Sequence, residues 1–360
     1  MQKRAEIFSL FFCKKFGKKS EKNKIEKMRK ILIIFLFFNF TKIFAATETH
    51  IFSAGWHLFS LPGIFFAEKN LVPEKMAPFN FNSIFGISEK FLAVGDSGLF
   101  FQYFPAEKIW REKKITINWL NDIFSTDGKN FLVAASAGDI LHFDGENWEN
   151  LPHLTFYELK KIWGKNRTFF FVGDTGVILK FIFDENFNLI ERKEISPKIF
   201  TDWRGIWGEN LNNIFVVGYD GIFLHSSDGG ENWIEKKISD QILNSVFGTK
   251  SGKIFAVGRN GTILKFKNLG ENWEKISAPT TENLNSIYEI GDEIFAVGDG
   301  GTILVSRNDG ENWEKIDSGT TKNLHSIFGE NEKIFAVGES GIFLERKNNE
   351  FLQIENFFVP

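Results

Sequence analysis

The chain has 360 residues, of which 43% are apolar and 16% aromatic, and 43 of them are Phe. This composition excludes an intrinsically disordered chain and favours a large, sheet-rich core. Residues 1–45 hold twelve basic and three acidic residues, so the remainder carries 31 basic and 43 acidic residues, a net charge of −12. So acidic a remainder argues against nucleic-acid binding and against electrostatic docking on an anionic membrane.

The first 45 residues have the layout of a secretory signal peptide. Basic residues crowd positions 1–30, an apolar run with Asn39 as its one polar residue occupies positions 31–40, and the small residues Ala45 and Ala46 follow. The run is short for a membrane span, which needs about 20 residues. We therefore predict a Sec-type signal cleaved near Ala45 or Ala46, with an uncleaved anchor as the alternative.

Cleavage there would leave a protein that is periplasmic or secreted and has no stable membrane span. It would also remove Cys13, the only cysteine, so the mature protein is expected to have no disulfide and no thiol chemistry. Met28 is an alternative start that gives a signal peptide of ordinary length. The predicted organisation is a basic extension plus signal peptide at 1–45, a segment that is a candidate edge or latch strand at 46–78, and repeats at 79–360.

A repeat of about 40 residues fills the rest of the chain. Its seven copies read FLAVGDSGLFF, FLVAASAGDIL, FFFVGDTGVIL, IFVVGYDGIFL, IFAVGRNGTIL, IFAVGDGGTIL and IFAVGESGIFL. The first glycine position is held by Gly95, Ala135, Gly173, Gly218, Gly258, Gly298 and Gly338, at spacings of 40, 38, 45, 40, 40 and 40 residues. Regularity of this kind indicates one structural unit repeated seven times.

Each repeat reads as four short strands. In the fifth copy these are LNSVFG, KIFAVGR, TILKFKN and NWEKIS, each rich in β-branched or aromatic residues and bounded by turn residues. Four strands in about 40 residues match a propeller blade and not a helical repeat. The predicted fold is all-β, a seven-bladed β-propeller of four-stranded antiparallel blades. The seventh repeat supplies its own fourth strand around 351–358, so residues 50–62 are not needed to complete a blade.

A second glycine follows the first by three residues in every repeat, at Gly98, Gly138, Gly176, Gly221, Gly261, Gly301 and Gly341. The two residues before it vary. We interpret this as a hairpin with a type I turn over the variable pair and a left-handed glycine in a bulge. These glycines are therefore predicted to shape turns and not to hold phosphate.

A tryptophan motif follows the third strand in four repeats. It reads HFDGENW, SSDGGENW, FKNLGENW and SRNDGENW. The fourth repeat matches Ser-x-Asp-x-Gly-x-x-Trp, the Asp-box or BNR repeat, and the sixth departs from it by one residue. The box residues are Ser226, Asp228, Gly230 and Trp233, and Ser306, Asn308, Gly310 and Trp313. We expect the Asp or Asn to cap its own turn and the Trp to pack between blades.

Together, the recurring IFAVGxxGTIL and DGxxW patterns resemble the photosystem II stability and assembly factor family of secreted propellers. The resemblance covers roughly residues 80–350. It implies the propeller fold, a structural role for the Asp-box and a role in binding or assembling other proteins. The basic partner-binding patch of that family has no counterpart here, because the mature chain is acidic and lacks a matching Arg cluster.

No enzyme motif emerges from the mature sequence. A sialidase-like glycosidase would need three Arg to clamp a carboxylate together with a Tyr–Glu nucleophile pair, and no Arg-Ile-Pro motif is present. The histidines show no HExxH or other close pairing, so we expect no metal and no cofactor. Calcium at an Asp-rich turn, such as that of Asp228 or Asp309, is left open as an alternative.

Two sets of residues are candidates for a partner surface, since binding concentrates on loops held by a rigid frame. Hairpin tips contribute Asp96, Asp174, Asp220, Arg259, Asp299 and Glu339. The entry strands place Asn82, Asn121, Lys160, Arg204, Asn244, Asn285 and His325 at one equivalent position near the central channel. We predict a non-enzymatic, monomeric scaffold that binds an unidentified protein. The alternative is a carbohydrate-binding or glycosidase propeller that uses exposed aromatics of the Trp motif.

Overall fold

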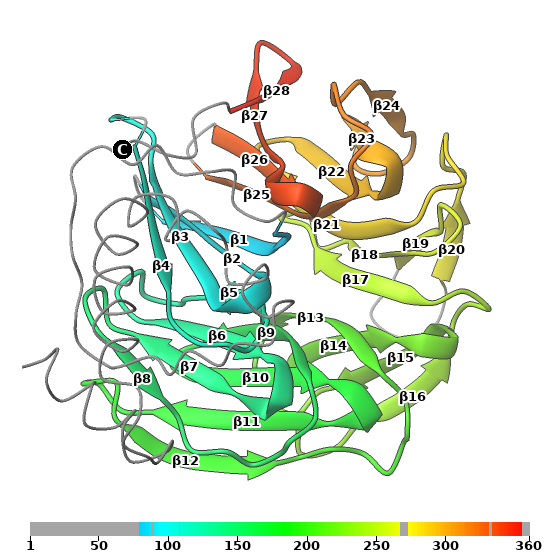
Figure 1. Cartoon of the computed structure of the whole chain (residues 1–360). Coiled ribbons are helices and arrows are strands. Elements are labelled where there is room, and N and C mark those ends of the chain that lie inside the picture. Colours follow the sequence, from blue (N-terminus) through cyan, green and yellow to red (C-terminus); the bar gives the residue numbers. More distant parts are fainter. Residues whose placement is uncertain (1–78, 88–89, 108, 267–272, 331–332, 355–360) are drawn as a thin grey trace, which may run out of the picture. The chain divides into compact units, whose positions relative to one another are not determined.

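The computed structural model describes residues 79–87, 90–107, 109–266, 273–330 and 333–354. These residues form seven four-stranded antiparallel sheets arranged as the blades of a propeller (Figure 1), so the predicted fold is confirmed. They contain no α-helix, and hence no helix suited to crossing a membrane. The predicted signal peptide at 1–45 and the segment at 46–78 lie outside the described residues.

Each blade takes four consecutive strands, the first of which is innermost (Figure 1). The first three blades are β1 (Phe81–Ile87), β2 (Lys90–Gly95), β3 (Leu99–Phe104) and β4 (Ile109–Lys114); β5 (Leu120–Phe124), β6 (Phe131–Ala135), β7 (Ile140–Phe143) and β8 (Trp148–Asn150); and β9 (Leu159–Lys165), β10 (Thr168–Gly173), β11 (Ile178–Phe183) and β12 (Leu189–Glu194). The fourth and fifth are β13 (Trp203–Asn210), β14 (Asn213–Gly218), β15 (Ile222–Ser226) and β16 (Ile234–Lys237); and β17 (Leu243–Gly248), β18 (Ile254–Gly258), β19 (Ile263–Phe266) and β20 (Trp273–Ile276). The sixth and seventh are β21 (Leu284–Ile290), β22 (Glu293–Gly298), β23 (Ile303–Ser306) and β24 (Glu314–Ile316); and β25 (Leu324–Glu330), β26 (Lys333–Gly338), β27 (Phe343–Lys347) and β28 (Glu350–Gln353).

The second strand of each blade is apolar on both faces because both faces are covered by neighbouring blades. In β10 all six residues are buried, and Phe169, Phe170 and Phe171 are fully enclosed. Alternate side chains therefore enter two different inter-blade clusters, Phe169 and Phe171 on one side and Phe170 on the other. Buried Phe residues occur in every one of the seven clusters.

The ring closes by side-by-side packing of the first and last blades, and among the described residues no strand is exchanged between them. Phe81 of β1 contacts Phe343 of β27 at 6.0 Å between ring centroids, and Ser340 N donates to Asn80 Oδ1 at 3.0 Å. The fourth strand of the last blade, β28, begins at Glu350 and ends at Gln353, earlier than the predicted 351–358, of which residues 355–358 lie outside the described range. The last blade thus completes its own sheet, as predicted.

The hairpins between second and third strands differ from the predicted type I turn. Six of them are the 3-10 turns η1 (Asp96–Gly98), η2 (Ser136–Gly138), η3 (Asp174–Gly176), η4 (Tyr219–Gly221), η5 (Asp299–Gly301) and η6 (Glu339–Gly341). Both Ser97 and Gly98 have positive φ, 58° and 73°, as in a type I′ turn. The type I assignment was wrong because a type I′ turn matches the twist of the flanking strands better.

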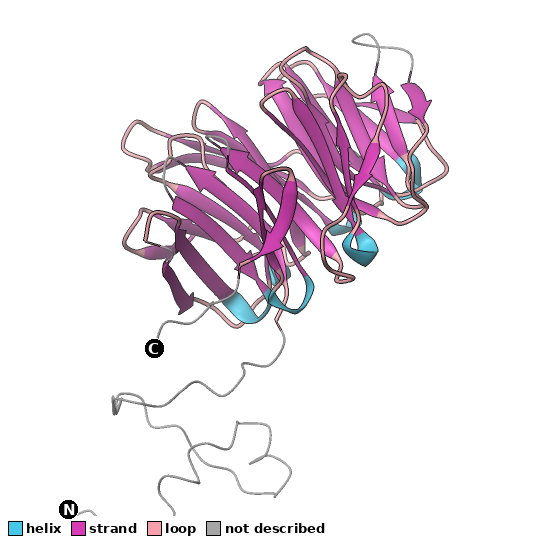
Figure 2. Ribbon diagram, turned by 90° about the horizontal axis from the view of Figure 1, so that it is seen from above, coloured by secondary structure: helices cyan, strands magenta, loops and turns pink. Residues whose placement is uncertain are grey.

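The path of the chain gives the ring two distinct faces. We call the face that carries these 3-10 turns and the linkers between blades the hairpin face; Figure 2 shows the turns along one side of the molecule. The linkers rest on the turns: Ile115 N donates to Gly98 O at 3.0 Å, and Ser136 N donates to Trp119 O at 2.9 Å. The opposite face carries the Asp-boxes, and we call it the box face.

Candidate functional site

A cavity of about 240 Å³ lies between the innermost strands. The second residue of every innermost strand lines it, and these are the seven residues singled out from the sequence: Asn82, Asn121, Lys160, Arg204, Asn244, Asn285 and His325. Glu158 and Lys161 also line the cavity, and the sequence analysis missed both. Glu158 ends the linker before β9 and Lys161 follows Lys160 in that strand, and no recurring position marks either residue in the sequence.

In five blades this lining residue bonds to a backbone carbonyl at the start of the next innermost strand. Asn82 Nδ2 donates to Leu120 O at 3.0 Å, Asn121 Nδ2 to Leu159 O at 2.9 Å, Asn244 Nδ2 to Leu284 O at 2.9 Å, Asn285 Nδ2 to Leu324 O at 3.0 Å, and His325 Nδ1 to Phe81 O at 2.9 Å. We call each of these contacts a clasp. The clasps join neighbouring blades. This structural role is sufficient to explain why these five polar residues line the cavity.

The third and fourth blades depart from this pattern. Lys160 forms an ion pair with Asp174 of its own blade. Arg204 donates to the Tyr219 hydroxyl at 3.0 Å, and its guanidinium carbon lies 4.8 Å from the centre of the Tyr219 ring. Within the described part of the chain Arg204 has no carboxylate partner, and its buried Nε has no acceptor. Of the cations that line the cavity, Arg204 is therefore the one whose charge is left for a ligand, while the Glu158 carboxylate accepts from Asn121 Nδ2 at 2.9 Å.

The predicted hairpin-tip residues belong to the same polar layer. Asp96 accepts hydrogen bonds from Asn80 and Asn82 at 2.7 and 3.2 Å, and Asp299 accepts equivalent bonds from Asn283 and Asn285 at 2.7 and 2.8 Å. The carboxylates thus orient the clasp amides instead of forming a free acidic rim.

The remaining tips differ from one another. Glu339 Oε2 accepts from Asn323 N at 3.2 Å. Asp220 and Arg259 are exposed, and neither makes an ion pair in the described ranges. These two tips are the ones whose charges face solvent.

Farther along the channel, the fifth residue of every innermost strand is aromatic. This aromatic collar consists of Phe85, Phe124, Trp163, Trp207, Phe247, Tyr288 and Phe328. Neighbouring rings touch: centroids are 4.9 Å apart for Phe85 and Phe328 and 5.0 Å apart for Tyr288 and Phe328. Burial in the collar, with the nearby Glu330 and Glu289, raises the pKa of Tyr288 to about 12. The sequence analysis missed the collar, although an aromatic recurs three residues after each lining position.

The Asp-boxes cap their own turns on the box face. In the fourth blade, Ser226 Oγ accepts from Gly230 N at 2.9 Å and Asp228 Oδ1 accepts from Asn232 N at 2.9 Å. Hydrogen bonds from the side chain and backbone of Asn232, together with one from the Ser226 hydroxyl, lower the pKa of Asp228 to about 2. In the sixth blade Ser306 and Asn308 repeat the two backbone bonds, each at 2.9 Å.

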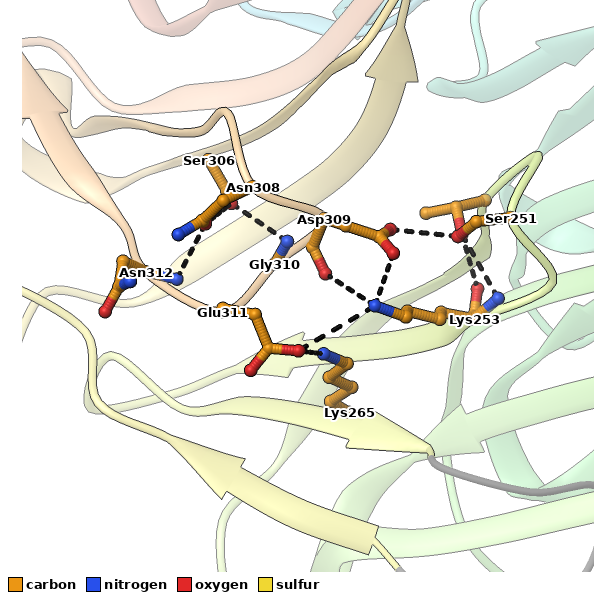
Figure 3. A network of polar contacts seen from close by, with 10 residues as sticks. Ser251, Lys253, Lys265, Ser306, Asn308, Asp309, Gly310, Glu311 and Asn312 are labelled. Atoms are coloured by element: carbon orange, nitrogen blue, oxygen red, sulfur yellow. Dashed lines mark hydrogen bonds and ion pairs between the residues drawn. The ribbon is translucent and has the colours of Figure 1, made fainter.

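Each box also grips the preceding blade. In Figure 3, Asp309 and Glu311 of the sixth blade reach Lys253 and Lys265 of the fifth. A Cβ on Gly310 would lie 2.2 Å from the Phe255 ring, so only glycine fits between the blades. The fourth blade does the same, with Glu231 Oε1 3.0 Å from Lys180 Nζ of the third.

The box tryptophans also pack between blades. Trp148 contacts Phe100 of the first blade at 4.9 Å, Trp273 contacts Phe223 of the fourth at 5.1 Å, and Trp313 is buried against Phe255. Trp233 packs in the cluster between the third and fourth blades. Trp313 is buried and the other three are half-buried, so the expectation that these tryptophans are exposed aromatics for a glycan was wrong.

The cavity lacks the parts that a sialidase-like site requires. A single arginine, Arg204, lines it within the described residues, so no three-arginine clamp is assembled there. The carboxylates proposed for calcium are engaged otherwise: Asp228 by Ser226 and Asn232, and Asp309 by Ser251 and Lys253. Across the described ranges, no group of three or more His, Cys, Asp or Glu is arranged to hold a metal ion.

Large apolar side chains are exposed on the hairpin face around the third blade. Three successive linkers, 115–119, 151–158 and 195–202, expose Ile117, Trp119, Phe156, Tyr157 and Phe200. We call these five residues the apolar sector. The sequence analysis missed it, since linker residues carry no periodic signal of burial or exposure.

Comparison with known proteins places the chain among propellers. Residues 267–347, from the last strand of the fifth blade to the third strand of the seventh, match the family described as photosynthesis system II assembly factor YCF48, so the expected resemblance is confirmed. No curated protein matches the chain in sequence. YCF48 from Cyanidioschyzon merolae is similar in structure, with a TM-score of 0.60 and 16% identity over 74% of this chain and 95% of that one.

Two further solved structures show similar agreement. YCF48 bound to a D1 peptide gives a TM-score of 0.60 at 15% identity, over 76% of this chain and 96% of that one. The WD40 propeller domain of Doa1 gives 0.63 at 10% identity, over 78% and 95%. At these identities the likeness concerns the fold.

Proposed function

We propose that this chain, a seven-bladed propeller resembling the YCF48 assembly factors, is a non-enzymatic scaffold that binds another protein through its hairpin face. The observation that carries the proposal is the apolar sector, beside a cavity whose lining includes the unmatched Arg204. Large exposed apolar side chains that gather on one face of a soluble protein are typical of interaction sites. The YCF48 structure with a D1 peptide provides a precedent for peptide binding by a similar propeller.

Cross-linked co-purification of the full-length chain from its native host tests this function. A protein should be recovered with the wild type and recovered less with Arg204→Gln, which removes the free charge at the cavity. Lys250→Gln is the matched control, because Lys250 is an exposed cation on the box face. Absence of any cross-linked protein, or equal loss in both variants, would refute binding through the hairpin face.

Export to the periplasm or beyond is part of the same proposal. It rests on the basic and apolar order of residues 1–45 and the small residues at Ala45 and Ala46. N-terminal sequencing of the protein recovered from the host should give a first residue near Ala46 in the fraction outside the cytoplasm. An intact N-terminus in the cytoplasmic fraction would overturn this part alone.

Carbohydrate binding is the second candidate, and the exposed Trp119 and Tyr157 are the observation that favours it. The neighbouring polar groups weaken it, because Asn118 and His153 already bond to Asp139 at 2.5 and 2.9 Å. Few unpaired polar groups therefore remain beside these rings for sugar hydroxyls. Retention on a glycan array, lost in Trp119→Ala, would support this candidate over protein binding.

A further inference from the structure

The apolar sector is confined to one part of the hairpin face. Phe200, Phe156 and Ile117 are 95%, 86% and 83% exposed, and they lie on the three linkers that join the first four blades. The other three linkers read ISDQI, SAPTTEN and DSGTTKN and expose no large apolar side chain within the described ranges. Since all six linkers have the same place in the repeat, the fold does not require apolar residues on the first three.

Two of the three linkers lead directly to the innermost strands that lack a clasp. The linker 151–158 ends at Tyr157 and Glu158 and leads to Lys160, and the linker 195–202 leads to Arg204. Arg204 keeps a positive charge without a carboxylate partner in the described part of a chain that is acidic as a whole. Apolar anchors and an unmatched cation therefore lie on the same linkers and the strands that follow them.

We infer that the apolar sector docks an extended segment of another protein, one that carries large apolar side chains and an acidic group, with the acidic group directed to Arg204. This inference rests on the proposed function and names the surface and the partner chemistry. The linkers follow one another around the ring, so an extended segment can cross them in turn, advancing about 3.3 Å per residue. Rigid exposed aromatics such as Trp119 and Tyr157 are the side chains that dominate binding energy at protein interfaces.

Charge complementarity selects an acidic segment over a basic one. A carboxylate beside Arg204 would gain a charge-assisted hydrogen bond from a guanidinium whose donors are incompletely used. A basic segment would meet the unpaired charge of Arg204 without compensation and would be disfavoured there. Burial of Phe156 and Phe200 against apolar side chains of the segment supplies the part of the affinity that depends little on its exact sequence.

Site-specific photo-cross-linking in the native host tests the inference. The photoreactive residue p-benzoylphenylalanine is placed at position 156 or 200 of the full-length chain, and at 190 or 234 as controls. Ile190 and Ile234 are also exposed, by 65% and 58%, but they lie on the outer strands β12 and β16. Cross-links from 156 and 200 should map, by mass spectrometry, to one short segment with apolar side chains and an Asp or Glu.

Two pairs of variants connect the cross-link to the proposed chemistry. Phe156→Ser with Phe200→Ser should reduce capture of that segment by about tenfold or more, whereas Ile190→Ser with Ile234→Ser should not change it. Arg204→Gln should reduce capture about threefold to tenfold, and Arg204→Lys should restore part of it. Retained native far-ultraviolet circular dichroism of each variant separates loss of contact from loss of fold.

Several results would overturn the inference. No cross-link above the control positions, a cross-link to a second copy of this chain, or attachment to a glycan would each exclude a docked segment of another protein. A basic or wholly polar cross-linked segment would contradict the assigned chemistry. If a partner is captured in the co-purification but cross-links only from other surfaces, this inference fails while protein binding stands.

Discussion

The box face and the hairpin face are built by the same repeat, but they differ in how many of their polar side chains have hydrogen-bond or ion-pair partners. On the box face, turn residues bond to their own turn or to the preceding blade, as Asp228 does with Asn232 and Glu231 with Lys180. On the hairpin face five clasps join blades, but Lys160 and Arg204 break the series, and the apolar sector lies beside them. Residues that recur from blade to blade therefore hold the blades together, and the positions that depart from the repeat mark the surface available to a partner.

The largest expected effect is on the box face, at Gly310. Its φ of +79° and the 2.2 Å approach of Phe255 leave no room for a methyl group, and Phe255 is fully buried and cannot move aside. Gly310→Ala should lower the free energy of unfolding by about 3 to 5 kcal/mol, from overpacking together with the left-handed backbone. Urea denaturation measures this change.

Gly252→Ala is the matched control for that substitution. Gly252 also has a left-handed backbone, with φ of +80°, but nothing lies within 4 Å of its added Cβ. Its loss should therefore be about 1 to 2 kcal/mol, from the backbone alone. Equal losses for the two variants would show that the grip of the box on the preceding blade contributes nothing.

A smaller effect is expected at the ion pairs of Figure 3. Lys265 is almost wholly buried beneath Glu311, which is itself about half exposed. Glu311→Gln should cost about 1 to 2 kcal/mol, less than the loss of a partner in a fully buried pair, because solvent screens the exposed side. Glu314→Gln breaks the exposed pair with Arg307 and should cost at most about 0.5 kcal/mol. Urea denaturation at two salt concentrations measures both losses. Added salt should reduce the loss of stability more for Glu314→Gln than for Glu311→Gln, because the first pair is the more exposed. The opposite result would contradict the assignment of Lys265 and Glu311 as the more buried pair.

On the hairpin face, loss of a clasp should lower the free energy of unfolding more than loss of Arg204 does. Asn285→Ala removes the bonds to Leu324 O and Asp299 and should cost about 1 kcal/mol. Arg204→Ala removes no contact between blades and should cost less than about 0.5 kcal/mol, while it weakens partner capture. Thermal and urea unfolding of both variants test the difference. A large stability loss with Arg204→Ala would assign Arg204 to assembly and not to binding.

Much of this architecture could be predicted from the sequence, because the length and number of the repeats can be read from it directly. The glycine spacing gave seven blades, and the equivalent position of Asn82 and His325 gave the lining of the cavity. Individual contacts could not be predicted. A clasp requires a backbone carbonyl of the next blade at hydrogen-bond distance from the Asn side chain, and the sequence does not show that distance. The apolar sector was missed for a related reason: Phe156 or Phe200 in a linker reads equally well as buried or exposed until the linker's path is known.

The smallest expected effect concerns acid stability of the box face. Hydrogen bonds from Asn232 lower the pKa of Asp228 from 3.8 to about 2, and bonds from Lys193 and Lys180 lower the pKa of Glu231. A lowered pKa means that the unfolded state binds protons first, so this stabilisation is complete above the ordinary pKa and is lost as pH falls toward 2. Stability should therefore decline from about pH 4.5 downward.

Asp228→Asn would isolate the contribution of one box to this decline. The amide oxygen can still accept from Asn232 N, as Asn308 does from Asn312 N in the sixth blade, but it does not titrate. The variant should therefore fold normally at neutral pH and show a shallower loss of stability between pH 4 and 2. Asp240→Asn, which removes a mostly exposed carboxylate paired only with Lys237, serves as the control. Because blade six already functions with Asn, an identical slope in the variant and the wild type would mean that the Asp-box carboxylate acts as a neutral acceptor and that its charge contributes nothing to the fold.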